Sequence, residues 1–244
     1  MVDHDQRNIL LVFQDTLAQP KPGRGRFIAG IFETAGEMKI ESGQVKKISS
    51  SGEVVHYPYT RPTMTYTDTR KGKIDHLVQV FGGRALPERR GASTRWVVRS
   101  MNAVEIASLA QEYAPGRQTI INAFQAWGNS HDNTERLRIA AEARQYSMRT
   151  DSVVTVEDYR DLVTDAQFIA GVIEARGAID TRNDQLGYLL VTSTNSALLL
   201  AIKEAYGGGI TEATAKSKVL SISKVSAIDV ITKSAQHLLT WGAY

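Results

Sequence analysis

The chain has 244 residues, of which 42% are hydrophobic and 23% charged, and its formal net charge is +3. This composition is typical of a folded globular protein and excludes pervasive disorder, and no apolar run approaches the roughly 18 residues that a membrane helix needs. The lack of cysteine excludes disulfides, zinc fingers, iron–sulfur clusters and thiol catalysis. The five histidines are scattered, which argues against a histidine-rich metal site.

Charge is unevenly distributed along the chain. Residues 1–150 contain 21 lysines and arginines against 15 acidic residues, a net charge of +6, whereas residues 151–244 contain 8 against 11, a net charge of −3. A basic first part suggests a polyanionic partner, although charge alone is equally compatible with a solvated surface. The first eight residues include Asp3 and Asp5 and do not resemble a secretory signal.

An internal repeat organises the sequence. The decamer FIAGIFETAG at 27–36 recurs 141 residues later as FIAGVIEARG at 168–177, with six of ten positions identical. Two further echoes follow in the same order, an aromatic-Gly-Gly triplet at 81–83 and 206–208 and a polar-to-apolar segment at 102–106 and 226–230. We infer two copies of one fold unit. The predicted divisions are an N-terminal extension at 1–26, a first repeat at 27–127, a linker with some helix at 128–167 and a second repeat at 168–244.

Both copies predict the same elements in chain order. The decamer opens a helix, and alternating apolar and polar residues then predict strands at 37–41 and 178–182, followed by strands at 63–67 and 188–192. Helices come next, with Asp68 or Thr69 and Thr194 as candidate N-caps, and the glycine pairs end them.

A second hairpin in each copy ends with 95–99 or 218–224. Capping-box patterns beginning at Asn102 and Ser226 then open a last helix. The predicted unit is α-β-β-α-β-β-α, twice. The first copy has 16 extra residues around 42–62, which predict a long hairpin arm or loop.

Small residues in the decamer indicate a close helix contact. A stripe of alanine and glycine lets another backbone approach, so we expect the two decamer helices to pack against each other about a pseudo-two-fold axis. The expected interface residues are Ala29, Gly30, Ala170 and Gly171.

The duplicated decamer and the order of elements resemble the single-chain, two-repeat form of the LAGLIDADG homing endonuclease family. The resemblance implies an α+β fold of tandem pseudo-two-fold repeats, in which two curved four-stranded antiparallel sheets form a saddle over the DNA major groove. It also implies an acidic residue before the final glycine of each decamer. These two carboxylates would bind divalent metal and drive phosphodiester cleavage.

This chain departs from the family pattern at both of those positions, which hold Ala35 and Arg176. Neither residue offers an oxygen to a hard cation, and the charge of arginine repels one. Because two-metal hydrolysis needs such ligands, we expect a catalytically inactive member with no metal and no cofactor. Glu33 and Glu174 remain two residues earlier, about 200° away around the helix. We interpret them as locally paired, for instance Glu174 with Arg176 and Glu33 with a linker arginine; a displaced metal site built on them is the weaker alternative.

The predicted strand faces carry residues suited to nucleic acid. Arginine makes bidentate contacts with guanine or phosphate, and threonine suits base edges. The candidates in the first copy are Lys39, Lys46, Lys47, Arg61, Thr63, Thr65, Thr67, Arg84, Arg89, Arg90, Arg95 and Arg99. Those in the second copy are Arg182, Lys216, Lys218 and Lys224. The weaker second set argues for a short footprint, or for RNA or a ribonucleoprotein as the partner.

The sequence thus predicts a nucleic-acid-binding protein without nuclease activity, a monomer with an internal pseudo-dimer. The expected partner is double-stranded DNA or structured RNA, with no membrane partner. Its duty would be that of a regulator, an intron maturase or a component of a ribonucleoprotein such as a ribosome. Two alternatives stay open: an active endonuclease with the displaced metal site, and a protein-interaction module.

Overall fold

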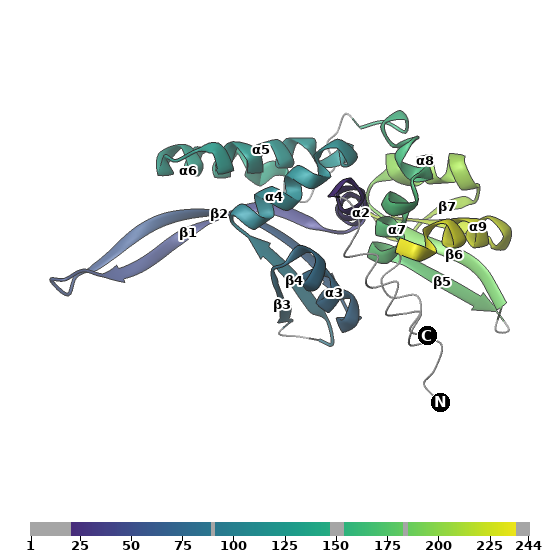
Figure 1. Cartoon of the computed structure of the whole chain (residues 1–244), viewed down its shortest axis with the longest axis horizontal. Helices are drawn as coiled ribbons and strands as arrows, with labels where there is room; N and C mark the ends of the chain where they lie inside the picture. The colour runs from purple at the N-terminus through teal and green to yellow at the C-terminus, as the bar shows by residue number, and fades with distance from the viewer. Residues whose placement is uncertain (1–20, 89–90, 147–153, 183–184, 238–244) are drawn as a thin grey trace.

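The computed structural model describes residues 21–88, 91–146, 154–182 and 185–237. Two α+β halves meet at helices α2 (Lys21–Thr34) and α7 (Ala166–Arg176), which lie side by side at the centre of the molecule (Figure 1). Each half contains one four-stranded antiparallel sheet, so the predicted fold class is confirmed. Within the described ranges, no helix combines the length and hydropathy needed to cross a membrane.

The two halves repeat the same order of elements, which is the predicted α-β-β-α-β-β-α. After α2 the first half contains β1 (Glu37–Ile48), β2 (Val54–Asp68), α3 (Lys71–Phe81), β3 (Arg84–Pro87), β4 (Thr94–Arg99) and α4 (Met101–Ala110). After α7 the second contains β5 (Gly177–Arg182), β6 (Gln185–Ser193), α8 (Ser196–Tyr206), β7 (Gly209–Glu212), β8 (Lys218–Ser223) and α9 (Lys224–Ser234). The strand orders β1-β2-β4-β3 and β5-β6-β8-β7 correspond one to one.

Helical segments connect the halves and are more extensive than the sequence indicated. They are η1 (Gln111–Tyr113), η2 (Pro115–Arg117), α5 (Gln118–Asn129), α6 (Asn133–Ala143), η3 (Arg144–Tyr146), η4 (Glu157–Tyr159) and η5 (Leu162–Thr164), and η6 (Ala235–His237) follows α9. Asp132 caps α6 by accepting hydrogen bonds from the backbone N–H groups of Thr134 and Glu135.

The extra residues of the first copy form a long hairpin arm. Strands β1 and β2 pair without interruption from Glu37 opposite Thr65 to Ile48 opposite Val54, and the arm projects well beyond the rest of the molecule (Figure 1). Helices α5 and α6 lie along its base (Figure 1). The Trp127 indole N–H donates to Thr60 Oγ1 at 2.8 Å, which ties the arm to α5.

Helices α2 and α7 approach each other at their glycines. A Cβ added to Gly30 would lie 2.2 Å from the carbonyl oxygen of Phe168, and one added to Gly171 would lie 2.0 Å from that of Phe27. Ala29 and Ala170 are fully buried beside them. This reciprocal contact is the one that the small residues of the decamers predict, and it joins the cores of the two halves.

Helix ends agree with the sequence only in part. Gly82 and Gly207 end α3 and α8 with positive φ angles of 72° and 75°, as the glycine pairs predict. The capping boxes at Asn102 and Ser226 are wrong, because α4 already begins at Met101 and α9 at Lys224, and neither helix has a side-chain cap.

The predicted N-caps of the middle helices are also displaced. Asn195, one residue after the predicted Thr194, caps α8 by accepting from the Leu198 N–H at 3.0 Å. Helix α3 follows Arg70, which makes no side-chain cap bond; Asp68 instead accepts from the Arg70 backbone N–H at 2.8 Å.

Candidate nucleic-acid interface and the base of the paired helices

Each sheet has one side packed on helices and one side without them, which we name the first and second open faces. On the first sheet Met38, Met64, Trp96 and Val98 are buried on the helix side. Side chains alternate along a strand, and directly paired residues share a face. The register pairs Lys39 with Thr63 and Thr63 with Arg99, so these three residues lie on the first open face.

Most of the predicted first-copy residues share the parity of that face. The first open face contains Lys39, Lys47, Arg61, Thr63, Thr65, Thr67, Arg84, Arg95 and Arg99, together with Glu37 and Glu41. Lys46 lies in the arm, as predicted, but it pairs with His56 and has the parity of the opposite face. Arg89 and Arg90 lie outside the described residues.

Several of these cations are paired with acids on or beside the face. Arg61 contacts Glu41 at 2.7 Å, Lys39 contacts Glu37 at 3.4 Å, and Arg95 contacts Glu88 at 2.9 Å. Burial pushes the pKa of Glu41 upward, but the hydrogen bond and charge of Arg61 outweigh it and lower the pKa below its ordinary value. Within the described part of the chain, the exposed Arg84 and Arg99 make no ion pair, so they are the cations most available to a ligand.

Two predicted contact residues are covered. The side chains of Thr63 and Thr65 are on the first open face, but the residues are only 1% and 7% exposed. Thr65 donates to Glu37 at 3.1 Å, and Thr63 donates to the Arg61 carbonyl at 3.4 Å. They support the longer side chains around them and, as placed, cannot reach base edges.

Two aromatic residues of the arm belong to the first open face and were not predicted from the sequence. Tyr57 and Tyr59 lie on the same face as Arg61, with Lys47 5.4 Å from the Tyr57 ring centre and Arg61 5.5 Å from that of Tyr59. The alternation of Val55, Tyr57, Tyr59 and Arg61 along the predicted hairpin arm was the signal in the sequence that could have identified them. Such an aromatic and basic stripe suits stacking and phosphate contact.

The second open face is less basic than predicted. Its described members are Ala178, Asp180, Tyr188, Leu190, Thr192, Thr211, Val219, Ser221 and Ser223. This described part, which leaves out the side chains of 181–186, contains no lysine or arginine. The described parts of the two open faces therefore differ in charge in the same sense as the two parts of the sequence.

The predicted cations of the second copy lie elsewhere. Lys218 pairs with Ser193 and Glu212 and has the parity of the buried Leu220 and Ile222, so its predicted placement is wrong. Lys224 is the first residue of α9 and not a strand residue, and Lys216 is exposed in the turn between β7 and β8. Arg182 ends β5, and its side chain is outside what the structure describes.

A pocket of about 1340 Å³ lies where the two halves meet, at the C-terminal ends of α2 and α7. Ala35 and Arg176, the residues before the final glycine of each decamer, both line it. The other charged residues that line it are the arginines Arg70 and Arg117 and the acids Glu37 and Asp68. Arg176 is exposed, and among the described residues it has no hydrogen-bond or ion-pair partner.

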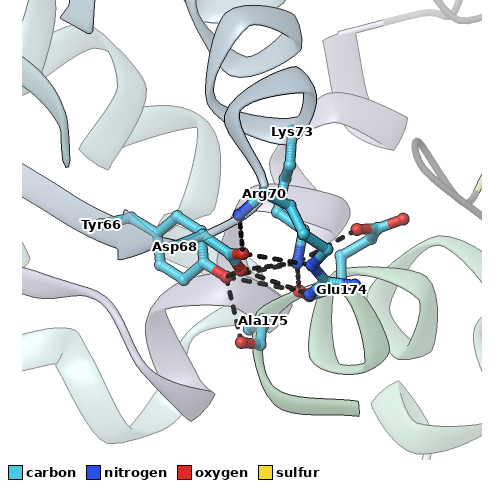
Figure 2. A network of polar contacts seen from close by, with 6 residues as sticks. All are labelled: Tyr66, Asp68, Arg70, Lys73, Glu174 and Ala175. Atoms are coloured by element: carbon cyan, nitrogen blue, oxygen red, sulfur yellow. Dashed lines mark hydrogen bonds and ion pairs between the residues drawn. The ribbon is translucent and has the colours of Figure 1, made fainter. Parts of the chain in front are cut away.

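A buried polar network holds the end of α7 against the first half (Figure 2). Lys73 on α3 is fully buried, with its Nζ 2.9 Å from Asp68 and 3.4 Å from the Glu174 carboxylate, and it also donates to the Glu174 carbonyl. Tyr66 donates to Asp68 at 2.6 Å and to the Ala175 carbonyl at 3.0 Å. The predicted pairing of Glu174 with Arg176 is therefore replaced by a pairing with Lys73.

The charges of this network are fixed by their contacts. Burial raises the pKa of Asp68, but hydrogen bonds from Arg70 and Tyr66 outweigh it and hold the pKa well below its usual range. Burial lowers the pKa of Lys73 below its ordinary value, although the negative charge of Glu174 acts in the opposite direction. A cation at the C-terminal end of a helix also complements the helix dipole.

A second network holds the end of α2. Glu33 is 1% exposed and accepts from the Gly116 N–H at 2.8 Å, Tyr159 at 2.5 Å and Asn195 at 2.9 Å. Burial raises the pKa of Glu33 to about 6, against the charge of Arg117. Arg117 itself donates to the Phe32 carbonyl at 3.0 Å. The arginine near Glu33 thus comes from the first repeat and not from the predicted linker.

The residues at the base of the paired helices do not fit a divalent metal ion. Ala35 has no ligand atom, Arg176 is cationic, and Asp68 is already bound by three donors. Glu33 and Glu174 are held in the two separate networks described above. Across the described ranges, no group of three or more histidine, aspartate or glutamate side chains is gathered as a metal site would require.

Comparison with known proteins shows the fold. No protein-family model and no curated protein sequence matches the chain. Among solved structures it is similar to the LAGLIDADG homing endonuclease I-GzeII in complex with its DNA target, with 13% identity, a TM-score of 0.54, and coverage of 86% of this chain and 83% of that one. It is also similar to a variant of I-SmaMI, with 11% identity, a TM-score of 0.58, and coverage of 87% of this chain and 83% of that one. For I-SmaMI bound to cleaved DNA the identity is 11%, the TM-score 0.54, and the coverage 87% of this chain and 82% of that one. The chain therefore has the two-repeat fold of LAGLIDADG homing endonucleases.

Proposed function

We propose that the chain binds a DNA duplex across its two open faces without cleaving it. The observation that carries this proposal is the base of the paired helices, where a methyl group and a guanidinium replace the two carboxylates that the family resemblance implies. I-GzeII and I-SmaMI are DNA-bound structures of the same fold, which favours a duplex as the ligand. Without carboxylate ligands at these positions, no metal ion would be held there to stabilise the attacking and leaving oxygens of phosphodiester cleavage.

Binding is expected to come mainly from the first half. The first open face supplies Arg84 and Arg99, which form no ion pair with any described residue, and the arm adds Lys47 with two tyrosines. A two-stranded ribbon fits the major groove, and helices α5 and α6 brace the arm at its base. The second open face would add hydroxyl groups and shape. We therefore expect a shorter and more asymmetric footprint than two equivalent halves would give.

A displaced nuclease site on Glu33 and Glu174 requires both groups to leave their present partners. Glu33 would lose three hydrogen bonds and Glu174 its contact with the buried Lys73. The loss of these contacts favours a binding protein over an enzyme. The roles of regulator, intron maturase and ribonucleoprotein component remain predictions from the sequence.

Selection from a random duplex library, followed by a salt titration of the selected DNA, tests the binding proposal. The logarithm of affinity should fall linearly with the logarithm of salt concentration. Replacing Arg84 and Arg99 together by alanine should reduce that slope by about 1.8, or about 0.9 for each lost phosphate contact. The matched control replaces Arg138 and Arg160, which are exposed and paired with neighbouring glutamates.

Two results would contradict the proposal, and a third would change the location of its contact surface. A binding curve that does not respond to salt would exclude phosphate contacts and favour the protein-interaction alternative. Stronger binding of a structured RNA than of the selected duplex, at equal salt, would replace DNA by RNA as the ligand. Equal slopes in the two arginine pairs would move the contact surface away from the first open face.

A further inference from the structure

Helix α9 carries an apolar stripe, Val225, Ile228 and Ile231, that is left uncovered by the described elements of the second half. Val225 is 81% exposed and Ile228 is 47% exposed, and Ile231 is only partly buried. Residues three apart on a helix are neighbours on its surface, so the three side chains form one row. Valine and isoleucine are poor helix formers, so local propensity does not account for them at exposed positions. The α9 stripe is therefore suited to being covered by another segment.

The matched helix of the first half shows how such a position is covered. The echo at 102–106 and 226–230 aligns α4 with α9, so Val104 corresponds to Ile228. Val104 is only 7% exposed, because α5 packs against α4. A Cβ added to Gly128 of α5 would lie 3.1 Å from Cγ1 of Val104, which places the α5 backbone directly over that side chain. Among the described residues, no helix takes the place of α5 on α9 (Figure 1).

Residues 238–244, which lie outside the described ranges, follow directly after η6 and have the sequence of a covering segment. They read LLTWGAY, contain no charged side chain, and repeat the Trp-Gly pair that α5 carries at 127–128. Leu238 precedes this tryptophan by three residues, as the fully buried Phe124 precedes the tryptophan of α5. The glycine of the α5 pair is the residue that lies over Val104. The sequence after α9 therefore repeats the part of α5 that covers α4.

We propose that residues 238–244 turn back after His237 and pack over the α9 stripe. Ile228 lies about 15 Å before His237 along α9 and η6, and Trp241 can reach about 13 Å beyond His237 in an extended chain. The indole can therefore lie at the level of Ile228, with Leu238 near Ile231. The segment would close the core of the second half as α5 closes that of the first. This inference goes beyond the proposed DNA binding and does not depend on it.

Acrylamide quenching of tryptophan fluorescence in the full chain, without nucleic acid, tests the proposal. Trp96 and Trp127 are buried, so the third tryptophan of the chain, Trp241, reports on the segment. In the unaltered chain all three should resist quenching. Ile228→Asp should expose one of the three and shift the emission to the red, because a carboxylate opposes burial beneath an indole. Adding Trp241→Phe to this variant should remove the quenchable component.

Two further variants control for effects on the fold. Val225→Asp changes the most exposed position of the α9 stripe and should expose the same tryptophan without disturbing the described core. Leu200→Asp makes the same kind of change at a leucine of α8 that is 42% exposed and outside the stripe, and it should leave quenching as in the unaltered chain.

The outcomes separate this segment from other partners of the stripe. A Trp241 that is equally quenchable in the unaltered chain, Ile228→Asp and Val225→Asp would overturn the proposal. Sedimentation of the same samples tests for a second copy of the chain. A dimer that Ile228→Asp converts to a monomer would place the partner chain on the stripe and also overturn the proposal. Monomers throughout, with protection of Trp241 lost only in the two stripe variants, would support it.

Discussion

The contact between α2 and α7 allows a quantitative test at Gly30. A Cβ at this position would lie 2.2 Å from the Phe168 carbonyl oxygen and 2.9 Å from the Val172 nitrogen. Ordinary contact begins at 3.4 Å, so the helices must separate by about 1.2 Å. Both clashing atoms belong to helix backbone, so no side-chain rotation can relieve the contact.

The expected cost of Gly30→Ala is about 3 kcal/mol in the free energy of unfolding. Overpacking of a tight interior usually costs about 1–3 kcal/mol, and a gap of this width also removes a quarter to a half of the dispersion energy between facing atoms. For a chain of this size the midpoint of thermal unfolding should fall by roughly 6–12 °C. Urea unfolding followed by tryptophan fluorescence measures the change, because Trp96 and Trp127 are buried.

Two further variants sharpen the Gly30 test. Gly72 lies in α3 with nothing within 4 Å of an added Cβ, so Gly72→Ala should stabilise the chain by about 0.5–1 kcal/mol. Gly171→Ala should be about as costly as Gly30→Ala, and the double variant should cost less than the sum, because the first substitution opens the gap for the second. Equal stability of Gly30→Ala and Gly72→Ala would refute the close backbone contact.

The buried networks and the arm supply three more predictions. Because burial raises the pKa of Glu33 from 4.5 to about 6, the folded state binds more protons than the unfolded state between these pH values, and the free energy of unfolding should fall by about 2 kcal/mol as pH rises through this window. Urea unfolding of Glu33→Gln at the same pH values should lack this fall. An identical pH profile in both proteins would be inconsistent with a titrating buried Glu33. Lys73→Met should lower the free energy of unfolding by about 3–5 kcal/mol, because it leaves Asp68 and Glu174 without their buried cation. Lys71 is exposed, so Lys71→Met should be nearly neutral in the same unfolding assay. Similar losses for the two variants would show that the network is not buried as described. Trp127→Phe should cost about 1 kcal/mol and speed hydrogen exchange in the arm near Thr60, and unchanged exchange there would mean that α5 does not brace the arm.

The fold could be predicted because its signals are local and duplicated. The decamers carry the small residues that form the α2–α7 contact, and the aromatic-Gly-Gly triplets mark helix ends where only glycine accommodates the backbone angle easily. Strict alternation at 63–67 fixed the parity of the first open face. Each of these features is a short pattern whose physical reason lies within a few residues.

The parts that the sequence did not predict depend on long-range contacts. A lysine in a helix is usually exposed, and nothing in the sequence around Lys73 indicates otherwise. It is buried because α3 meets the end of α7, where its partner Glu174 lies 101 residues further along the chain. The helices α5 and α6 are stabilised against the arm in the same way. The placement of Lys218 could have been predicted correctly from its neighbours. Leu220 and Ile222 form the core side of β8, and Lys218 shares their parity, whereas residues of the other parity, such as Ser221, face away from the core.

The central claim is that this fold binds DNA and leaves it intact. The most direct measurement incubates the full chain with the selected duplex, at a salt concentration where binding is complete, with Mg²⁺ or Mn²⁺, and resolves both strands on a denaturing gel. The account predicts a bound duplex with two unbroken strands. Cleavage at a defined phosphodiester that disappears in the Glu33→Gln, Glu174→Gln double variant would contradict it and establish an active site built on those two carboxylates.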